Sequence, residues 1–340
     1  MRRSSRAHRA SSGRFFLTTF HPRKDNLLVV SLLLSLVLMM SPLIGMQAEA
    51  SPAATDSFAI RSVVVSVADA NGTPVAGLNE DDFEVTESGV GRDVVEVQGD
   101  VWQEVVLLVD TSADFRDAIP SLRKGIETFA APLREPQRVL LAAFGGSVYH
   151  LAGPTADPDV LVRAAGRINA RLEKAFLMDA MAEVCSGVTA TRTVDSDPPA
   201  LVIVTGLTAD DSSTPLEEVY RLVRESGVLI NVILYDPPEQ TSRFERRGQL
   251  ENFLATLAQS SGGHFARALA AGALPDTLGE WGAELMQPLY RVSFLTELEP
   301  PAALEGLTVG VTRQEAHVVP IRLMPYQRVV SASATEESNP

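Results

Sequence analysis

The stretch VVLLVDTSADF, residues 105–115, decides the fold class. Its first five residues are apolar, and such a run predicts a strand buried on both faces, as in a parallel sheet. Asp110, Ser112 and Asp114 follow at alternate positions just past the strand. Oxygen ligands at the carboxyl end of a parallel strand are candidates to hold a hard cation such as Mg²⁺. The stretch therefore raises the question of whether this loop binds a metal.

Strand and helix patterns alternate around this stretch. Apolar runs that predict strands occupy residues 105–109, 139–144, 201–205 and 228–235. Apolar residues at helical spacing occupy residues 119–133, 159–170, 176–188, 215–226 and 249–260. This alternation predicts an α/β domain over residues 101–288, a doubly wound and mostly parallel sheet with helices on both faces.

Two small β segments flank the predicted domain. Residues 51–100 are rich in β-branched residues and turn signals, and residues 289–330 return to strand-like patterns. Neither segment is long enough to bury a core of its own, so each is expected to pack on its neighbour. The tail, residues 331–340, is polar and is expected to be disordered.

Residues 1–50 have the three parts of a secretory signal peptide. A basic region precedes the apolar run Leu27–Met40, and AEA at 48–50 forms a cleavage site before Ser51. We expect a secreted or periplasmic protein with no membrane span after cleavage. The alternative is an uncleaved segment that anchors the protein to the inner membrane.

The charge and cysteine content exclude several classes of partner and stabilisation. Residues 1–50 carry seven basic and two acidic residues, so the rest of the chain has a formal net charge of −19, against −14 for the whole. Such acidity disfavours nucleic acid as a partner. The lone Cys185 excludes an internal disulfide, so stability must come from packing.

Three motifs, in their order, resemble one family. The DTSAD turn after a buried strand is similar to the start of the metal ion-dependent adhesion site in von Willebrand factor type A (VWFA) domains, Asp-x-Ser-x-Ser. NGTPVAGLNEDDFEVTESG at 71–89 and LYRVSFL at 289–295 resemble flanking segments of exported bacterial VWFA-related proteins. The resemblance covers residues 58–326. It implies a VWFA or Rossmann-like fold and a protein-binding function.

Carried over by position, the family's metal site is incomplete. Asp110 and Ser112 match the first two ligands, and Asp114 replaces the third, a Ser. Ala175 stands where the family has Thr, and Gly206 where it has Asp. The resemblance therefore implies a degenerate site of Asp110, Ser112 and Asp114, to which Mg²⁺ would bind weakly or not at all. No other cofactor is expected.

Two further interpretations of this region remain open. Asp179, or Asp210 with Asp211, could supply the missing oxygens from nearby loops. Alternatively, DTSAD is a turn that enters a helix, with Ser112 or Asp114 capping backbone N–H groups.

The sequence assigns no catalytic residue. The P-loop, H-E-x-x-H and G-x-S-x-G patterns are all absent, and only His150, His264 and His317 follow the signal segment. We therefore expect a non-enzymatic, exported VWFA-like adhesion or scaffold module that binds a protein in the cell envelope or outside the cell. The alternatives are a cell-envelope hydrolase with an unrecognised active site, for example one that uses Ser112 and His264, and a membrane-anchored structural protein.

Overall fold

The computed structural model describes residues 57–171, 174–191, 196, 199–207, 210–236, 244–297 and 306–331. Its contacts divide the chain into residues 1–54 and 55–340, and all the described residues lie in the second unit. The predicted signal peptide, residues 1–50, and residues 332–340 of the predicted tail lie outside the described residues. Among the helices of the described part, none combines the length and apolar character needed to cross a membrane.

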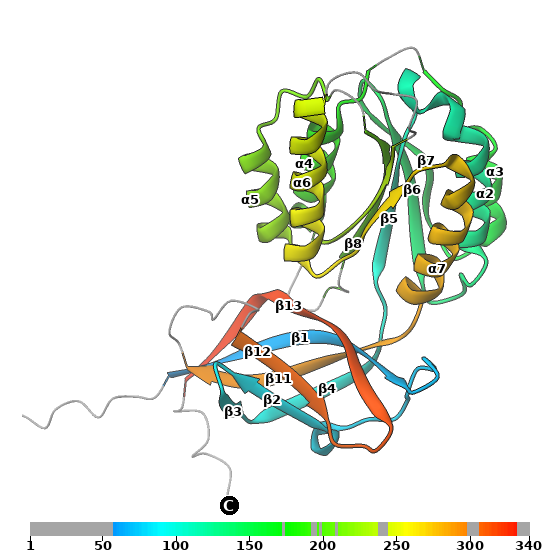
Figure 1. Ribbon diagram of the computed structural model, residues 1–340. Helices are drawn as coiled ribbons and strands as arrows, with labels where there is room; N and C mark the ends of the chain where they lie inside the picture. The colour runs from blue at the N-terminus through cyan, green and yellow to red at the C-terminus, as the bar shows by residue number, and fades with distance from the viewer. Residues whose placement is uncertain are drawn as a thin grey trace, which may run out of the picture. The chain divides into compact units, whose positions relative to one another are not determined.

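A six-stranded sheet forms the centre of the α/β part (Figure 1). Its strands are β5 (Glu104–Asp110), β6 (Arg138–Phe144), β7 (Val148–Thr155), β8 (Pro199–Gly206), β9 (Leu229–Tyr235) and β10 (Phe265–Ala268). They lie in the order β10-β9-β8-β5-β6-β7, and every pair is parallel except β6 with β7. The four predicted strands and the doubly wound, mostly parallel fold class are confirmed. The two edge strands, β7 and β10, were not predicted.

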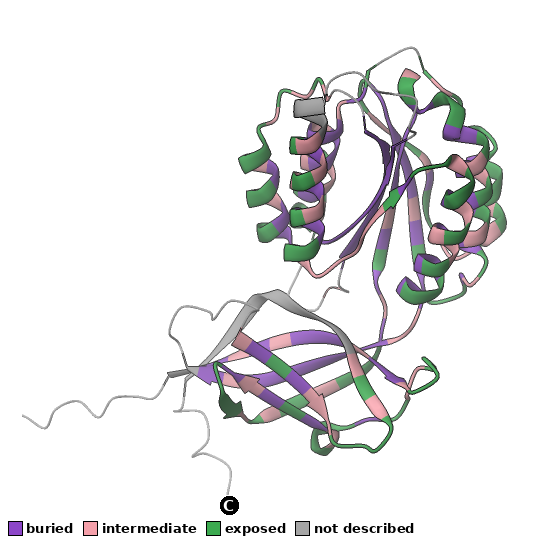
Figure 2. Cartoon of the chain, viewed as in Figure 1, coloured by how far each residue is buried: buried purple, intermediate pink, exposed green. Residues whose placement is uncertain are grey.

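Helices cover both faces of this sheet. α2 (Ile119–Ala130), α3 (Pro158–Ala165) and α7 (Leu274–Leu285) pack on one face, and α4 (Leu177–Thr191), α5 (Leu216–Ser226) and α6 (Phe244–Ser261) on the other. Neighbouring residues of β5 enter different cores, Leu107 the first and Leu108 the second. This double burial explains why the strand is apolar at successive positions, and Figure 2 shows the central strands as buried. Helix α7 was not predicted.

The two flanking β segments pair with each other. The first contributes β1 (Ser57–Asp69), β2 (Phe83–Glu87), β3 (Val90–Arg92) and β4 (Val94–Val101), and the second β11 (Leu289–Glu297), β12 (Leu307–Val311) and β13 (Ala316–Ser331). These strands form two sheets, β13-β1-β11-β4 and β12-β2-β3. β1 lies between two strands of the second segment. Its apolar residues Val63, Val65 and Val67 are buried in a core built from both segments, and not against the α/β part as expected.

The order of strands identifies the edge where a ligand site is expected. The sheet begins at β5 and grows through β6 and β7 on one side, then through β8, β9 and β10 on the other. Loops that leave β5 and β8 therefore diverge at the carboxyl ends of these two neighbours. In open α/β sheets, ligands bind in the crevice at this switch point. Asp110 is the last residue of β5, and Gly206 is the last of β8.

Candidate functional site

Asp110 is fully buried at the switch point and is paired by protein donors. Its Oδ1 accepts a hydrogen bond from the Ser112 backbone N–H at 2.7 Å. Its Oδ2 accepts from the Gly206 backbone N–H at 3.1 Å and from Thr205 Oγ1 at 3.0 Å. Burial raises the pKa of Asp110, although these hydrogen bonds act in the opposite direction. The carboxyl group thus joins the ends of β5 and β8.

The other two predicted ligands differ in their surroundings. Ser112 precedes the 3₁₀ helix η3 (Ala113–Ala118) but makes no side-chain capping bond, so the interpretation of Ser112 as a cap is wrong. Its hydroxyl is buried and has no hydrogen-bond partner among the described residues. Asp114 lies on η3 and is exposed. The turn does lead into helix α2, with Pro120 in its first turn.

The second and third loops are bound to each other at the same edge. Ala175 is buried and forms a parallel bridge with Asp210. Asp210 Oδ1 accepts from the Leu177 backbone N–H and from Ser212 Oγ, both at 2.8 Å. Burial is the main cause that raises the pKa of Asp210. These bonds attach the loop after β8 to the first turn of α4.

Asp179 provides the reciprocal connection from α4 to that loop. Its carboxylate accepts bonds from Thr214 Oγ1 at 2.6 Å, from the Thr214 N–H at 2.8 Å and from the Ser213 N–H at 3.1 Å. Burial alone would raise the pKa of Asp179, but these bonds outweigh it and the pKa is lowered. Asp211 pairs with Lys174. The three acids that were considered as replacement ligands therefore bind the protein's own groups.

The residues at this edge do not fit a divalent cation. Mg²⁺ needs several convergent oxygens in octahedral geometry, whereas both oxygens of Asp110 already accept protein hydrogen bonds. Ala175 and Gly206 carry no side-chain oxygen. Within the described residues, no group of three or more His, Cys, Asp or Glu side chains could hold a metal ion. Weak or absent binding of Mg²⁺ stays a prediction that only a binding measurement tests.

A second set of side chains lines the same edge beside β6. Thr111 Oγ1 donates to the Phe144 carbonyl at 2.7 Å and accepts from Tyr149 Oη at 3.1 Å. The Arg171 backbone N–H donates to the Thr111 carbonyl at 2.7 Å. The guanidinium carbon of Arg171 lies 4.2 Å from the centre of the Tyr149 ring. Sequence reasoning missed Thr205, Tyr149 and Arg171, because no local pattern brings them to Asp110. Only Thr205 had a signal, since it ends a predicted strand.

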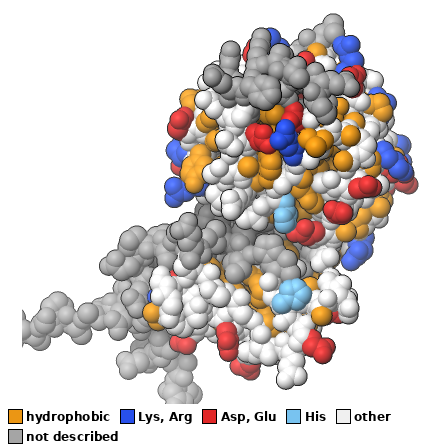
Figure 3. Space-filling view, in the orientation of Figure 1, with side chains coloured by type: hydrophobic (Ala, Val, Ile, Leu, Met, Phe, Trp, Pro, Cys, Tyr) orange, Lys and Arg blue, Asp and Glu red, His pale blue; other side chains and the backbone are white. Residues whose placement is uncertain are grey.

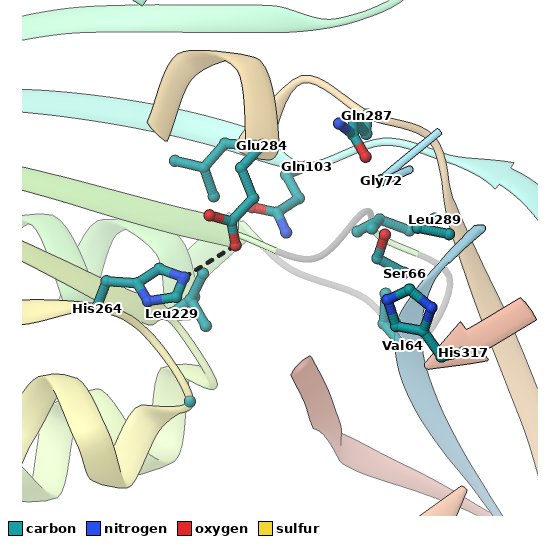
Figure 4. Close-up of a pocket in the computed structure, with 13 residues that line it drawn as sticks. Val64, Ser66, Gly72, Gln103, Leu229, His264, Glu284, Gln287, Leu289 and His317 are labelled. Carbon is teal, nitrogen blue, oxygen red and sulfur yellow. Dashed lines mark hydrogen bonds and ion pairs between the residues drawn. The ribbon is translucent and has the colours of Figure 1, made fainter. Parts of the chain in front are cut away.

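The opposite, amino edge of the sheet contains a cavity of about 220 Å³ (Figure 4). His264 Nε2 is 2.9 Å from Glu284 Oε1, and this bond raises the pKa of His264. His317 lines the same cavity (Figure 4). Figure 3 shows acidic and basic side chains interspersed with apolar ones on the visible face of the α/β part.

The fold separates the two residues of the hydrolase alternative. Ser112 follows the carboxyl end of β5, whereas His264 precedes the amino end of β10. Because β5 and β10 run parallel in one sheet, these side chains lie at opposite edges. Cys185 is buried in α4, and burial raises the pKa of its thiol to about 11, which leaves it unreactive at neutral pH.

The chain is similar to several solved structures. One is a von Willebrand factor type A protein from Catenulispora acidiphila, with 13% identity, 80% of this chain and 75% of that chain covered, and a TM-score of 0.45. Another is the conserved hypothetical protein BatB from Bacteroides thetaiotaomicron, with 14% identity, 54% and 98% coverage and a TM-score of 0.40. A third is an aerotolerance-related membrane protein from Bacteroides fragilis, with 13% identity, 54% and 99% coverage and a TM-score of 0.39.

No protein-family model matches this chain. The comparison with curated proteins also finds no match. Since the three TM-scores lie below 0.5, the fold assignment rests on the strand order and the two helical layers of the chain itself.

Proposed function

We propose that this chain is an exported protein-binding module of the adhesion or scaffold kind. Its binding surface is the carboxyl edge of the six-stranded sheet, formed by the loops after β5, β6 and β8. The partner is a protein of the cell envelope or the extracellular space. The signal-like residues 1–50 and the acidic remainder of the chain support export and disfavour nucleic acid.

The observation that carries this proposal is the hydrogen-bonded junction of the loops at that edge. Asp110 holds the end of β8 to the end of β5, while Asp179 and Asp210 hold the third loop to α4. Loops that are fixed by buried or partly buried polar bonds lose little conformational entropy on binding, which favours recognition by a preformed surface. An impaired metal site belongs to this proposal, because side chains of the protein make the connections between the loops.

A non-enzymatic role is the second part of the proposal. Among the described residues at the carboxyl edge, no hydroxyl is hydrogen-bonded to a histidine, which a nucleophile and its base would require.

Affinity capture from the envelope fraction of the source cell tests the binding surface. The bait is wild-type protein or the variant Ser147→Glu/Lys174→Glu, which alters exposed residues of two loops at the carboxyl edge. The matched control is Arg138→Glu/Gln259→Glu, which makes the same charge change at exposed positions of the amino edge. A specific partner should bind wild type and the control variant but not the carboxyl-edge variant.

The same capture in excess EDTA or excess Mg²⁺ tests the metal. Equal recovery of the partner in both conditions is expected. Loss of the partner in EDTA, restored by Mg²⁺, would refute the metal-free part of the proposal. In the comparison of variants, equal loss of the partner from the carboxyl-edge variant and from the control variant would place the binding surface elsewhere.

A further inference from the structure

A stripe of arginines runs from α3 along the segment after it and reaches the carboxyl edge at Arg171, in an otherwise acidic protein. The chain carries 43 acidic and 29 basic residues, yet no acid occurs from Val160 to Leu172. That segment holds Arg163, Arg167 and Arg171 at intervals of four, and all three are exposed. Clustered exposed charges of one sign attract ligands of the opposite sign. This segment is therefore a candidate site for an acidic ligand.

The segment that carries these arginines is fixed on both sides. Arg123 of α2 donates to the Ile168 carbonyl and to Asn169 Oδ1. Asn169 Nδ2 donates to the Arg167 carbonyl at 3.0 Å, and the Arg171 N–H donates to the Thr111 carbonyl at 2.7 Å. The backbone of residues 167–171 thus has a defined position beside the loop after β5.

The guanidinium groups of Arg171 and Arg167 are also oriented. Arg171 lies over the ring of Tyr149, whose hydroxyl is itself bound to Thr111. Arg167 Nη2 donates to the Leu151 carbonyl at 2.7 Å. The other N–H groups of this guanidinium remain available to a ligand. None of the described carboxylates pairs with Arg163, Arg167 or Arg171. A stacked, planar guanidinium with free donors is suited to two-point recognition of a carboxylate.

We infer that this stripe, Arg163, Arg167 and Arg171, docks an acidic segment of the protein partner. The inference rests on the proposed function and names the chemistry of the partner at that edge. Charge complementarity selects the occupant, because a segment rich in Asp or Glu would be repelled by the rest of this acidic surface and attracted here. Arg171 contributes more than charge, since its position over Tyr149 is defined before binding.

Fluorescence anisotropy with a labelled peptide of alternating Glu and Gly residues tests the inference. The purified wild-type protein should bind this peptide, and the same peptide with Gln in place of Glu should not bind. Binding should weaken as salt is added, because exposed charges are screened. Arg163→Gln/Arg167→Gln/Arg171→Gln should lower the affinity about tenfold, the combined effect of three exposed pairs. The control Arg134→Gln/Arg138→Gln/Arg224→Gln removes the same charge from other exposed positions and should change affinity by less than about twofold.

Further variants and a vesicle assay test the role of the stacked guanidinium, a pure effect of net charge and a membrane as the occupant. Arg171→Lys keeps the charge but loses the planar fork, so it should weaken binding, and full affinity in this variant would overturn the role of the stacked guanidinium. Equal weakening by the stripe and control variants would show that only net charge matters and would overturn the site. Co-sedimentation of wild type, but not of the stripe variant, with vesicles of phosphatidylcholine and phosphatidylserine, without binding of the peptide, would make the occupant a membrane.

Capture of the partner with the stripe variant as an additional bait distinguishes a failure of this inference from a failure of the proposed function. If the captured partner is lost from the carboxyl-edge variant but retained by the stripe variant, the binding surface stands and the acidic segment is refuted. If both variants retain the partner, the proposed surface itself fails.

Discussion

Asp110, which the sequence predicted as a metal ligand, bonds to groups of the protein itself. Its two oxygens accept from Ser112, Thr205 and Gly206 in a site that is closed to solvent. A buried carboxyl group is tolerated only when donors surround it, and here the backbone supplies two of the three. The residue was identified from the sequence, whereas its partners depend on the pairing of β5 with β8.

Removing the Asp110 carboxyl group should destabilise the fold strongly. Asp110→Ala leaves two buried N–H groups and the Thr205 hydroxyl without an acceptor, at a cost of about 3 kcal/mol or more. Thr205→Val removes only one bond with little change of shape and should cost about 1 kcal/mol. Urea unfolding of the three proteins measures both values. A loss for Asp110→Ala no larger than that for Thr205→Val would show that water or another group replaces the carboxylate.

Asp110 should also make stability depend on pH. Because burial raises its pKa in the folded state, the folded protein binds a proton more readily than the unfolded chain. The free energy of unfolding of wild type should therefore fall, relative to Asp110→Asn, as pH rises from about 4 through the raised pKa. Unfolding of both proteins across this range measures the difference. If the free energy of unfolding of wild type instead rises with pH relative to Asp110→Asn, the hydrogen bonds lower the pKa of Asp110 more than burial raises it.

The His264–Glu284 pair should act in a higher pH range. The hydrogen bond to Glu284 raises the pKa of His264, so its stabilisation is complete below about pH 6.5 and is lost as pH rises through the raised pKa. Glu284→Gln should lower the melting temperature more at pH 5.5 than at pH 9, modestly, since both side chains are more than 40% exposed (42% and 43%). Glu280→Gln removes an exposed acid from the same helix and should show no such contrast. Equal effects of Glu284→Gln at both pH values would contradict the pair.

At the level of elements, helices α2 and α7 approach each other closely. An added methyl carbon at Gly282 of α7 would lie 2.4 Å from the Phe129 carbonyl oxygen of α2. At Gly125 of α2 it would lie 2.5 Å from Leu278 of α7. The two helices approach each other because glycine leaves room for the backbone of the neighbour. Helix α7 was not predicted, and no sequence pattern indicated that it packs against α2.

Gly282→Ala should therefore destabilise the protein although alanine favours helices. The new methyl group overlaps the backbone of α2, and such overpacking costs about 1–3 kcal/mol. Gly187→Ala on α4 is the matched control, since an added carbon there meets nothing within 4 Å. That variant should gain about 0.5–1 kcal/mol from helix propensity. Thermal unfolding compares the two, and stabilisation by both would refute close packing of α2 against α7.

For the whole molecule, the two flanking segments form one β module with its own core. The buried residues of the two α/β cores all come from residues 105–286. The core of the β module combines residues such as Val63 and Phe83 of the first segment with Tyr290 and Val309 of the second. The chain therefore enters the β module, leaves it to form the α/β part, and returns to complete it.

Truncation should expose this dependence. Residues 51–100 alone should stay unfolded, because β1 then lacks both of its neighbours. Residues 101–288 should keep a cooperative melting transition, since their cores are complete. Circular dichroism and thermal melting of each fragment measure these outcomes. Joining residues 51–100 to residues 289–331 by a short linker should restore folding, and failure there would show that the β module needs the α/β part.

The sequence by itself determined the α/β class, four of the six strands of the main sheet, five of its helices and the position of Asp110. Strands such as β5 and β8 are buried on both faces, so their residues are apolar at successive positions, and that signal is local. The edge strands β7 and β10 are partly exposed and lack this signal. A resemblance in order of motifs then indicated which loops would meet.

Only the tertiary structure decided what those loops do when they meet. The bonds of Asp110 to Thr205, of Asp179 to Thr214 and of Arg171 to Thr111 join residues that are distant in the chain. The pairing of β1 with β11 and β13 is of the same kind. Periodicity reports which face of an element is buried, but hydrogen bonds depend on position and direction in space. These are set by strand order and register, which no single segment of the sequence contains.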